Sequence, residues 1–299
     1  MQRRFLTLDV FTSRRLTGNP LAVVLDAQGL GTGAMQALAR EFNLPETVFV
    51  LPPDNPAHRA RLRIFTPATE LPFAGHPTVG AAVALARIAG GGETQAFVIE
   101  ETIGPVACTA QPRQGDAGYA VFALPRLPAR VGDLAAAADI AAALSLDAAD
   151  IDAARFAPAC WSAGVDFPLV GLTSRDAVRR ARPDLARFAA VFGGRGPAKA
   201  FLFCEDTENP AHTIYARMFA PGLGVAEDPA TGSAAAAFAG LWVAQARPVD
   251  GSHSLTIEQG YDMGRPSLMA LAVTVAGGAL TGATIGGDAV VVSEGRIEA

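Results

Sequence analysis

The sequence has few cysteines and histidines, and none of them forms a known disulfide or metal-binding pattern. Its 299 residues include three cysteines, Cys108, Cys160 and Cys204, with no CxxC pair among them. An odd, scattered set in a chain of this size excludes a disulfide framework and indicates reduced thiols in a cytoplasmic protein. The four histidines offer no HExxH motif and no pair at a metal-ligand spacing, so we expect no metal.

Long apolar runs and an excess of positive charge are also missing. The longest apolar run, residues 234–244, is well short of the roughly 20 residues that span a bilayer. The first ten residues alternate like a strand and contain no long apolar segment of an export signal. The 24 lysines and arginines are outnumbered by 29 aspartates and glutamates, so no broad positive field attracts phosphate backbones. We therefore expect neither a membrane nor a nucleic acid as partner.

The common nucleotide and nucleophile motifs are absent as well. There is no GxGxxG despite 31 glycines, no Walker loop around the single lysine, Lys199, and no serine in GxSxG. Nucleotide-binding and α/β-hydrolase functions therefore lack motif support. Acid/base chemistry without a cofactor remains.

The chain is long enough for two domains. At roughly 100–200 residues per domain, 299 residues allow two cores, and a composition that is 50% hydrophobic and 18% charged is that of a folded protein. The composition changes around Pro125 to Arg130, where two prolines precede an alanine-rich stretch, 134–154. We predict an N-terminal domain over residues 1–127 and a C-terminal domain over 128–286.

Periodicity predicts alternating strands and helices in the first hundred residues. The apolar face of a helix is given by Met35, Leu38, Ala39 and Phe42, and this helix ends by Leu44 because Pro45 follows. Glu46 then stands at the start of a strand. A helix of small residues is predicted from about Thr78 to Ala89, stopped by three glycines. The predicted strands are 5–10, 21–25 (after a turn at 17–20), 47–51, 61–65, two or three up to residue 124, and 289–292.

Two segments recur at about half the chain length. Residues 63–67 (RIFTP) return as 217–221 (RMFAP), 154 positions later, and each copy is followed by a loop and a small-residue helix. Residues 76–82 (HPTVGAA) match 228–234 (DPATGSA), 152 positions later. The shared order and near-equal spacing favour duplication over chance in an alanine-rich sequence. They predict two similar lobes, each a sheet around one small-residue helix, with the two helix N-termini facing one cleft.

Four motifs in register carry a family resemblance. They occur in the order 43–47 (NLPET), 73–80 (FAGHPTVG), 227–234 (EDPATGSA) and 259–267 (QGYDMGRPS). With them, nearly the whole chain resembles the phenazine-biosynthesis PhzF-like isomerase family, which shares the diaminopimelate epimerase fold.

The resemblance implies an α+β fold of two similar lobes, each a curved mixed sheet wrapped around a central helix, with the active site in the cleft between them. It also suggests that the last strand, within 287–299, returns to the first lobe. It implies a homodimer without a cofactor that acts on a small carboxylate-bearing substrate. By the same resemblance, Glu46 shuttles a proton, and His76, Asp228 and Ser233 line the site.

Each of these residues also has a structural interpretation. Glu46 could be an ordinary surface carboxylate, and His76 a structural histidine. Asp228 precedes a proline at an expected helix start and could be an N-cap, a role compatible with function. Ser233 could be a packing residue, although beside Gly232 it presents a hydroxyl and free backbone N–H groups to an anion. We predict catalytic roles for Glu46, His76 and Asp228, and substrate binding by Gly75, Gly232, Ser233 and Ala234.

Physical chemistry supports the arrangement. Two helix N-termini facing one cleft favour a substrate carboxylate. A glutamate buried there would keep its proton to a higher pH than an exposed one, because burial disfavours the charged form. Proton abstraction and redelivery on the same molecule is isomerisation. Two alternatives stay open: a non-catalytic small-molecule binder that retains the fold, and a racemase or epimerase with non-thiol bases. The two-thiol type is excluded because no cysteine stands at either helix start.

Overall fold

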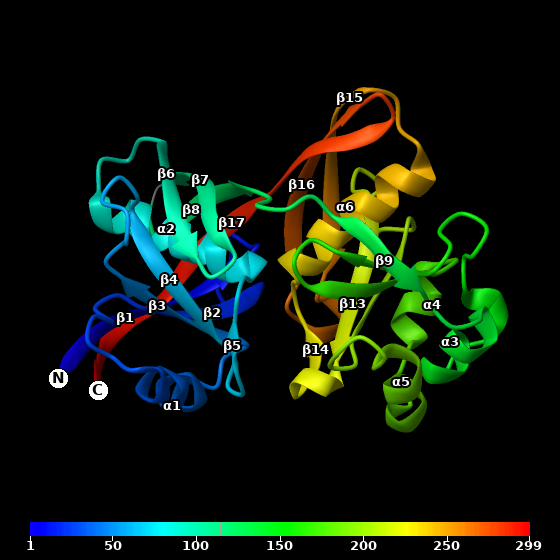
Figure 1. Cartoon of the computed structure of the whole chain (residues 1–299), viewed down its shortest axis with the longest axis horizontal. Helices are drawn as coiled ribbons and strands as arrows, with labels where there is room; N and C mark the ends of the chain where they lie inside the picture. The colour runs from blue at the N-terminus through cyan, green and yellow to red at the C-terminus, as the bar shows by residue number, and fades with distance from the viewer. Residues whose placement is uncertain (114) are drawn as a thin grey trace. The chain divides into compact units, whose positions relative to one another are not determined.

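The computed structural model describes residues 1–113 and 115–299, and the chain divides into two compact units. Unit 1 is Met1–Pro125 together with Ile285–Ala299, and unit 2 is Arg126–Thr284. Both are mixed α/β structures rich in strands (Figure 1).

The described part of unit 1 contains a mixed sheet and the helices α1 and α2. β2 and β3 are parallel, β3 and β4 antiparallel, and β4 and β6 parallel, after which β6, β7 and β8 pair in antiparallel order. β1 pairs with β2 on one side and with β17 on the other, so the end of the chain completes this sheet. The elements are β1 (Gln2–Val10), β2 (Asn19–Val24), α1 (Thr32–Phe42), β3 (Glu46–Leu51), β4 (Ala60–Phe65), β5 (Glu70–Leu71), α2 (Gly75–Ala89), β6 (Gln95–Glu101), β7 (Gly104–Pro112), β8 (Ala117–Ala123) and, from Ile285 onward, β17 (Ala279–Glu298).

Unit 2 repeats this pairing order. β10 and β11 are antiparallel, β11 and β12 parallel, β12 and β13 antiparallel, β13 and β15 parallel, and β15 and β16 antiparallel. β14 pairs with β13 as β5 does with β4. The elements are β9 (Ala129–Asp133), α3 (Ala137–Ala143), η1 (Ala148–Asp150), β10 (Ala159–Ser162), β11 (Asp166–Gly171), α4 (Arg175–Arg180), α5 (Leu185–Phe192), β12 (Ala200–Cys204), β13 (Ile214–Ala220), η2 (Pro221–Leu223), β14 (Val225–Asp228), α6 (Gly232–Ala246), β15 (Gly251–Gln259), η3 (Tyr261–Met263) and β16 (Ser267–Ala276).

The predicted amphipathic helix is α1. It buries Met35, Leu38 and Ala39 in a cluster that includes Phe49 and Phe65. It ends at Phe42 because Asn43 takes the left-handed conformation (φ 50°) just before Pro45.

The central helices α2 and α6 are made of small residues because strands pass very close to them. A Cβ added at Gly80 of α2 would lie 2.5 Å from Leu21 Cδ2 and 2.8 Å from Val10 Cγ2. In α6, a Cβ added at Gly240 would lie 2.6 Å from the Trp161 ring. Each helix contacts several strands of its own unit, α2 those from β1 to β3 with β7 and β8, and α6 those from β9 to β11 with β16.

The structure corrects several predicted boundaries. The helix predicted from Thr78 begins at Gly75, because Pro77 lies in the first turn, where its missing N–H has no intrahelical acceptor to lose. The turn predicted at 17–20 is too long at its C-terminal end, because β2 already starts at Asn19 and Pro20 pairs with Asp9. The final strand is much longer than predicted, Ala279–Glu298 instead of 289–292.

The predicted match of 76–82 to 228–234 is wrong in register. Both central helices have 15 residues and begin with glycine, α2 at Gly75 and α6 at Gly232, so His76 corresponds to Ser233 and not to Asp228. The proline after Asp228 suggested a helix start, but Asp228 ends strand β14.

Candidate functional site

The site in unit 1 is built on a glutamate and a histidine. Glu46 is the first residue of β3, paired with Leu21 of β2, and His76 is the second residue of α2. Glu46 Oε2 lies 3.0 Å from His76 Nε2, with 14% of the glutamate side chain and 4% of the histidine side chain exposed. The structure therefore brings these two predicted residues into direct contact in a nearly dry environment.

His76 is held neutral by its surroundings. Burial lowers the pKa of the imidazole to about 3, against a hydrogen bond with the Pro20 backbone that acts in the opposite direction. At neutral pH the ring therefore has one N–H donor and one acceptor nitrogen. With its proton on Nε2, such a ring can donate to an ionised Glu46 without becoming charged itself.

Asn19 completes this group and was missed by the sequence analysis. Its Nδ2 lies 3.2 Å from His76 Nδ1, and the residue is fully buried at the start of β2. An asparagine before a proline is typical of a turn, so nothing local indicated a buried side chain. The amide sets which hydrogen bond the second ring nitrogen makes, and this in turn selects the tautomer that faces Glu46.

The N-terminus of α2 lies at the same place. Gly75 is its first residue, and its N-cap, Ala74, gives no side-chain hydrogen bond to the first turn. The first amides of a helix have no intrahelical acceptor and carry the positive end of the helix dipole. This end of α2 therefore offers N–H groups to an anion beside the Glu46–His76 pair.

In unit 2, the predicted residues gather at the start of α6. Gly232, Ser233 and Ala234 are the first three residues of α6, and its N-cap is Thr231. Asp228 is therefore not the N-cap that the sequence allowed. Instead its Oδ2 accepts a hydrogen bond from Thr231 Oγ1 at 2.5 Å.

Gln259, at the end of β15, holds this segment in place. Its Nε2 donates to the Asp228 carbonyl at 2.7 Å and to Thr231 Oγ1 at 3.1 Å, and its Oε1 accepts from the Thr231 N–H at 3.1 Å. The side chain is completely buried. The next residue, Gly260 (φ +79°), lies so close to the loop that an added Cβ would be 2.6 Å from the Pro229 carbonyl oxygen. The fourth sequence motif thus includes a brace for the third.

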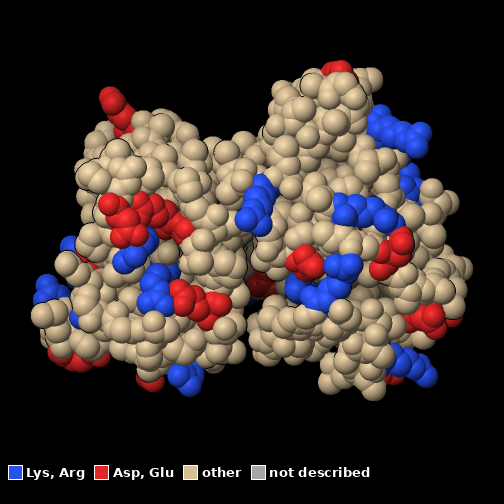
Figure 2. Space-filling model, in the orientation of Figure 1, with Lys and Arg blue, Asp and Glu red and all other residues tan. Residues whose placement is uncertain are grey.

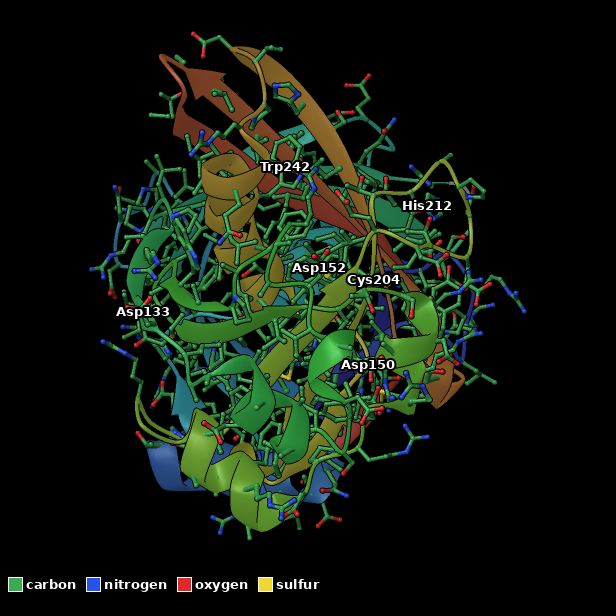
Figure 3. All side chains as sticks on the ribbon, turned by 90° about the vertical axis from the view of Figure 1, so that its right-hand side faces the viewer. Asp133, Asp150, Asp152, Cys204, His212 and Trp242 are labelled. Carbon is green, nitrogen blue, oxygen red and sulfur yellow. The ribbon has the colours of Figure 1, made fainter. Side chains whose placement is uncertain are left out.

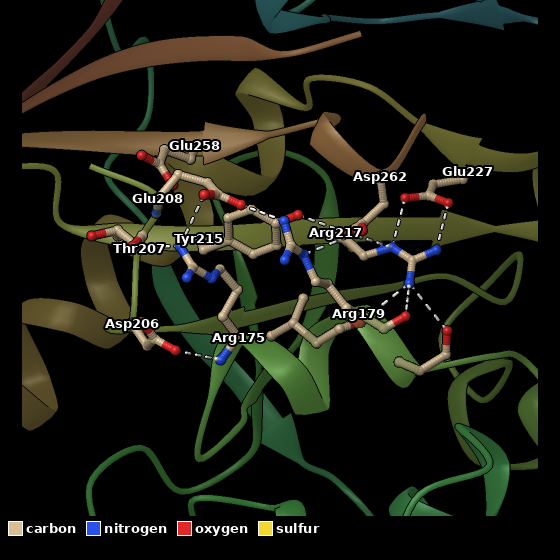
Figure 4. A network of polar contacts seen from close by, with 12 residues as sticks. Arg175, Arg179, Asp206, Thr207, Glu208, Tyr215, Arg217, Glu227, Glu258 and Asp262 are labelled. Carbon is tan, nitrogen blue, oxygen red and sulfur yellow. Dashed lines mark hydrogen bonds and ion pairs between the residues drawn. The ribbon is translucent and has the colours of Figure 1, made fainter. Parts of the chain in front are cut away.

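The polar groups around this segment are tightly paired (Figure 4). Arg217 of β13 donates with both arms of its guanidinium to Glu227 at 2.8 Å, and its third nitrogen reaches backbone carbonyls that follow α4 and lie in its last turn. Arg63 of β4 makes the same forked contact with Glu70 in unit 1. These pairs fix the strand that leads into each central helix. On the face shown in Figure 2, acidic and basic side chains likewise gather in small mixed clusters on each unit.

Comparison with known proteins identifies the family. The family model described as phenazine biosynthesis-like protein matches residues 8–295. The chain belongs to this family.

Relatives in the family are named isomerases. An uncharacterised isomerase of Mesorhizobium japonicum is 49% identical over 99% of this chain and 98% of its own. A trans-2,3-dihydro-3-hydroxyanthranilate isomerase of Pseudomonas aeruginosa is 34% identical over 98% of each chain. The crystal structure of a PhzF-family phenazine biosynthesis protein of Bacillus anthracis is 25% identical, covers 100% of both chains and has a TM-score of 0.89.

The cysteines of this protein are poorly suited to act as thiolates. All three are buried on strands β7, β10 and β12, none at the start of α2 or α6. Burial raises the pKa of Cys108 and of Cys204 to about 12, and it also raises the pKa of Cys160. Cys204, labelled in Figure 3, ends β12 within unit 2. Such thiols are poor nucleophiles and poor bases.

Among residues 1–113 and 115–299, no group of three or more histidine, cysteine, aspartate or glutamate side chains is arranged to hold a metal ion. In the same part of the chain, no helix is both long enough and apolar enough to cross a bilayer.

Proposed function

We propose that this protein is an isomerase that moves a proton from one atom to another of a small carboxylate-bearing substrate, with Glu46 as the proton carrier. The contact between Glu46 and the buried His76 is the observation that supports this most strongly. The relatives named isomerases support the reaction class.

The proposed step conserves the composition of the substrate. The Glu46 carboxylate takes a proton from a substrate carbon, and the electron pair of that C–H bond shifts into the neighbouring unsaturated system. Glu46, now a carboxylic acid, returns the proton at a second carbon of the same molecule. One group that acts first as base and then as acid is sufficient, so no second reactant is needed.

His76 supports the ionised state of Glu46. Asn19 Nδ2 donates to Nδ1, so the neutral ring carries its proton on Nε2 and can donate it to the Glu46 carboxylate that begins the transfer. A charged imidazolium would hold Glu46 ionised and oppose the first step. The low pKa of His76 therefore suits a proton carrier beside it.

We propose that substrate binds in a cleft between two similar lobes, which correspond to units 1 and 2. The substrate carboxylate would bind the N–H groups that begin α2 and α6, at Gly75, Gly232, Ser233 and Ala234. Asp228 would approach the substrate from the second lobe as an orienting group or as a second proton relay. Homodimer formation and the absence of a cofactor remain predictions.

The test uses the purified protein in deuterated buffer with a panel of small cyclic and amino-acid-like carboxylates. The panel includes trans-2,3-dihydro-3-hydroxyanthranilate, the compound in the name of the Pseudomonas relatives. An isomerase converts at least one compound to an isomer of the same composition. It also introduces deuterium into the product when the proton held by Glu46 exchanges with the solvent before it is returned to the substrate. A binder gives a dissociation constant and no deuterium, and a racemase gives deuterium only at a stereocentre whose connectivity is unchanged. Either result would overturn the proposed reaction.

A further inference from the structure

The two units share a second repeated feature at the end of the strand that follows each central helix. In unit 1, the carboxylate of Glu100 accepts the N–H groups of Asp54 and Asn55, both at 2.8 Å, and contacts His58 Nδ1 at 2.8 Å. In unit 2, the carboxylate of Glu258 accepts the N–H groups of Glu208 at 2.7 Å and Asn209 at 2.9 Å, and contacts the Nδ1 of His212 at 2.7 Å (His212 is labelled in Figure 3). Glu100 and Glu258 therefore correspond.

The residues that follow them must also correspond, and these are Glu101 and Gln259. Each is the last residue of its strand, and each side chain reaches the beginning of the central helix. Gln259 bonds to Thr231, the N-cap of α6. Glu101 Oε1 lies 2.7 Å from the hydroxyl of Thr78, in the first turn of α2. A neutral amide in one unit and a carboxyl group in the other hold the same part of the fold.

The hydrogen bonds of Thr78 show which form of the carboxyl group fits. Its Oγ1 lies 2.7 Å from the Ala74 carbonyl and 2.7 Å from Glu101 Oε1. A hydroxyl group has a single proton, and a carbonyl oxygen can only accept. Each contact has a proton of its own when Thr78 donates to Ala74 and Glu101 donates to Thr78. This arrangement needs a proton on Glu101.

The surroundings of Glu101 agree. The residue is 7% exposed, and its Oε2 is buried with no hydrogen-bond partner among the described residues. No ion pair in the described part of the chain includes it. Burial raises its pKa to about 8, and a hydrogen bond that the ionised form would accept from Thr78 acts in the opposite direction.

The charged groups near Glu101 are occupied elsewhere. On β4, Arg61 pairs with Asp54 and Arg63 pairs with Glu70, while the His58 side chain lies on Glu100. His58, Arg61 and Arg63 line a cavity of about 470 Å³ together with Glu101. From β7, the nearest titratable group is Cys108, whose pKa is raised to about 12, first by burial and then by Glu101. None of these groups supplies a positive charge to an ionised Glu101.

We propose that Glu101 is a protonated, neutral anchor that fixes the first turn of α2, and that its ionisation in mildly alkaline solution loosens this turn. Glu101 is thus a positioning residue for His76, two residues before Thr78. Only this last link rests on the proposed function.

The sign of the pH effect follows from proton binding. The folded protein holds the Glu101 proton more tightly than the unfolded chain, so this group favours the folded state fully in acid and loses its contribution as pH rises toward 8. Each pH unit between the two pKa values changes the folding equilibrium constant about tenfold. Glu101→Gln supplies a permanently neutral side chain, as Gln259 does in unit 2, and removes this dependence.

The experiment compares urea unfolding of wild type and Glu101→Gln from pH 5 to pH 9. The ratio of their folding equilibrium constants should shift in favour of the variant by roughly a hundredfold or more between pH 5 and pH 8, then level off. A constant ratio, a less stable variant at pH 8, or a variant that does not fold would overturn the proposal, because a neutral amide should replace a neutral acid.

Glu100→Gln is the matched control. The backbone N–H groups of Asn55 and Asp54 hold the pKa of Glu100 below its usual value, so its contribution is present at neutral pH and lost in acid. This variant should therefore be least stable relative to wild type at neutral pH, the opposite trend.

Two further measurements need no substrate. Infrared spectra at pH 6.5 should show a carboxylic-acid carbonyl band in wild type that is weaker in Glu101→Gln, and an unchanged band would contradict the protonated state. Gln259→Glu should bring a second loss of stability with rising pH into unit 2. With a substrate available, Glu101→Gln should shift the alkaline limb of the pH profile of kcat to higher pH. Glu46→Gln should instead lower turnover strongly at every pH. The two results distinguish failure of the anchor proposal from failure of the proposed function.

Discussion

Removing the side-chain amide of Gln259 should loosen the segment that contains Asp228 and Thr231. Gln259→Ala takes away the donor to the Asp228 carbonyl, at 2.7 Å, and the acceptor for the buried Thr231 N–H, at 3.1 Å. A buried polar group left unsatisfied costs about 1–3 kcal/mol. Because the Asp228 carbonyl is only partly buried, we expect the two losses together to lower the free energy of unfolding by about 2–4 kcal/mol.

Urea unfolding measures this cost, and amide hydrogen exchange locates it. The Thr231 amide should exchange faster in Gln259→Ala than in wild type, while amides of unit 1 keep their rates. The control is Gln111→Ala, an exposed glutamine on β7, which should change stability by less than about 0.5 kcal/mol. If Gln259→Ala is as stable as this control, or if Thr231 keeps its protection, the brace described for Gln259 is wrong.

Two further predictions concern packing and the thiols. Gly80→Ala should lower stability by about 1–3 kcal/mol, because its Cβ would overlap Leu21 and Val10. Gly33→Ala in α1, whose Cβ would meet no neighbouring atom within 4 Å, should be neutral or slightly stabilising. Thermal unfolding measures both variants, and the reverse order of stability would refute the close approach of β1 and β2 to α2. Alkylating reagents should react slowly with the folded protein and leave any isomerase activity intact, because all three cysteines are buried; rapid inactivation that substrate prevents would restore a thiol mechanism.

The parts of the fold set by periodicity were predictable. The apolar spacing of α1 and the stop imposed by Pro45 indicated its position to within a turn. The repeat of 63–67 at 217–221 marks β4 and β13, which pair with corresponding strands of their own units. A second repeat, 55–58 (NPAH) at 209–212, has the same spacing and was overlooked. It marks the two loops that bind Glu100 and Glu258.

The features of the site that the sequence did not predict correctly share a physical cause. A sequence shows which residues are polar but not which polar residues the tertiary structure buries. The sequence therefore placed Asn19 in a turn and did not indicate a role for Glu101. The false register between His76 and Asp228 arose because proline is acceptable both in the first turn of a helix and directly after a strand. The pairing of Glu46 with His76 required the parallel contact of β2 with β3 and the position of α2, which residues far apart in the chain determine together.

The central claim is that the Glu46 carboxyl group carries the transferred proton. The most direct test measures turnover and deuterium incorporation at saturating substrate for wild type, Glu46→Gln and the exposed control Glu41→Gln. Because glutamine keeps the shape but can neither accept nor return the proton, Glu46→Gln should lose roughly 10²–10⁴-fold or more in kcat and its deuterium incorporation, with substrate affinity nearly unchanged. Glu41→Gln should match wild type. A Glu46→Gln variant that still turns over and exchanges protons within tenfold of wild type would contradict the mechanism.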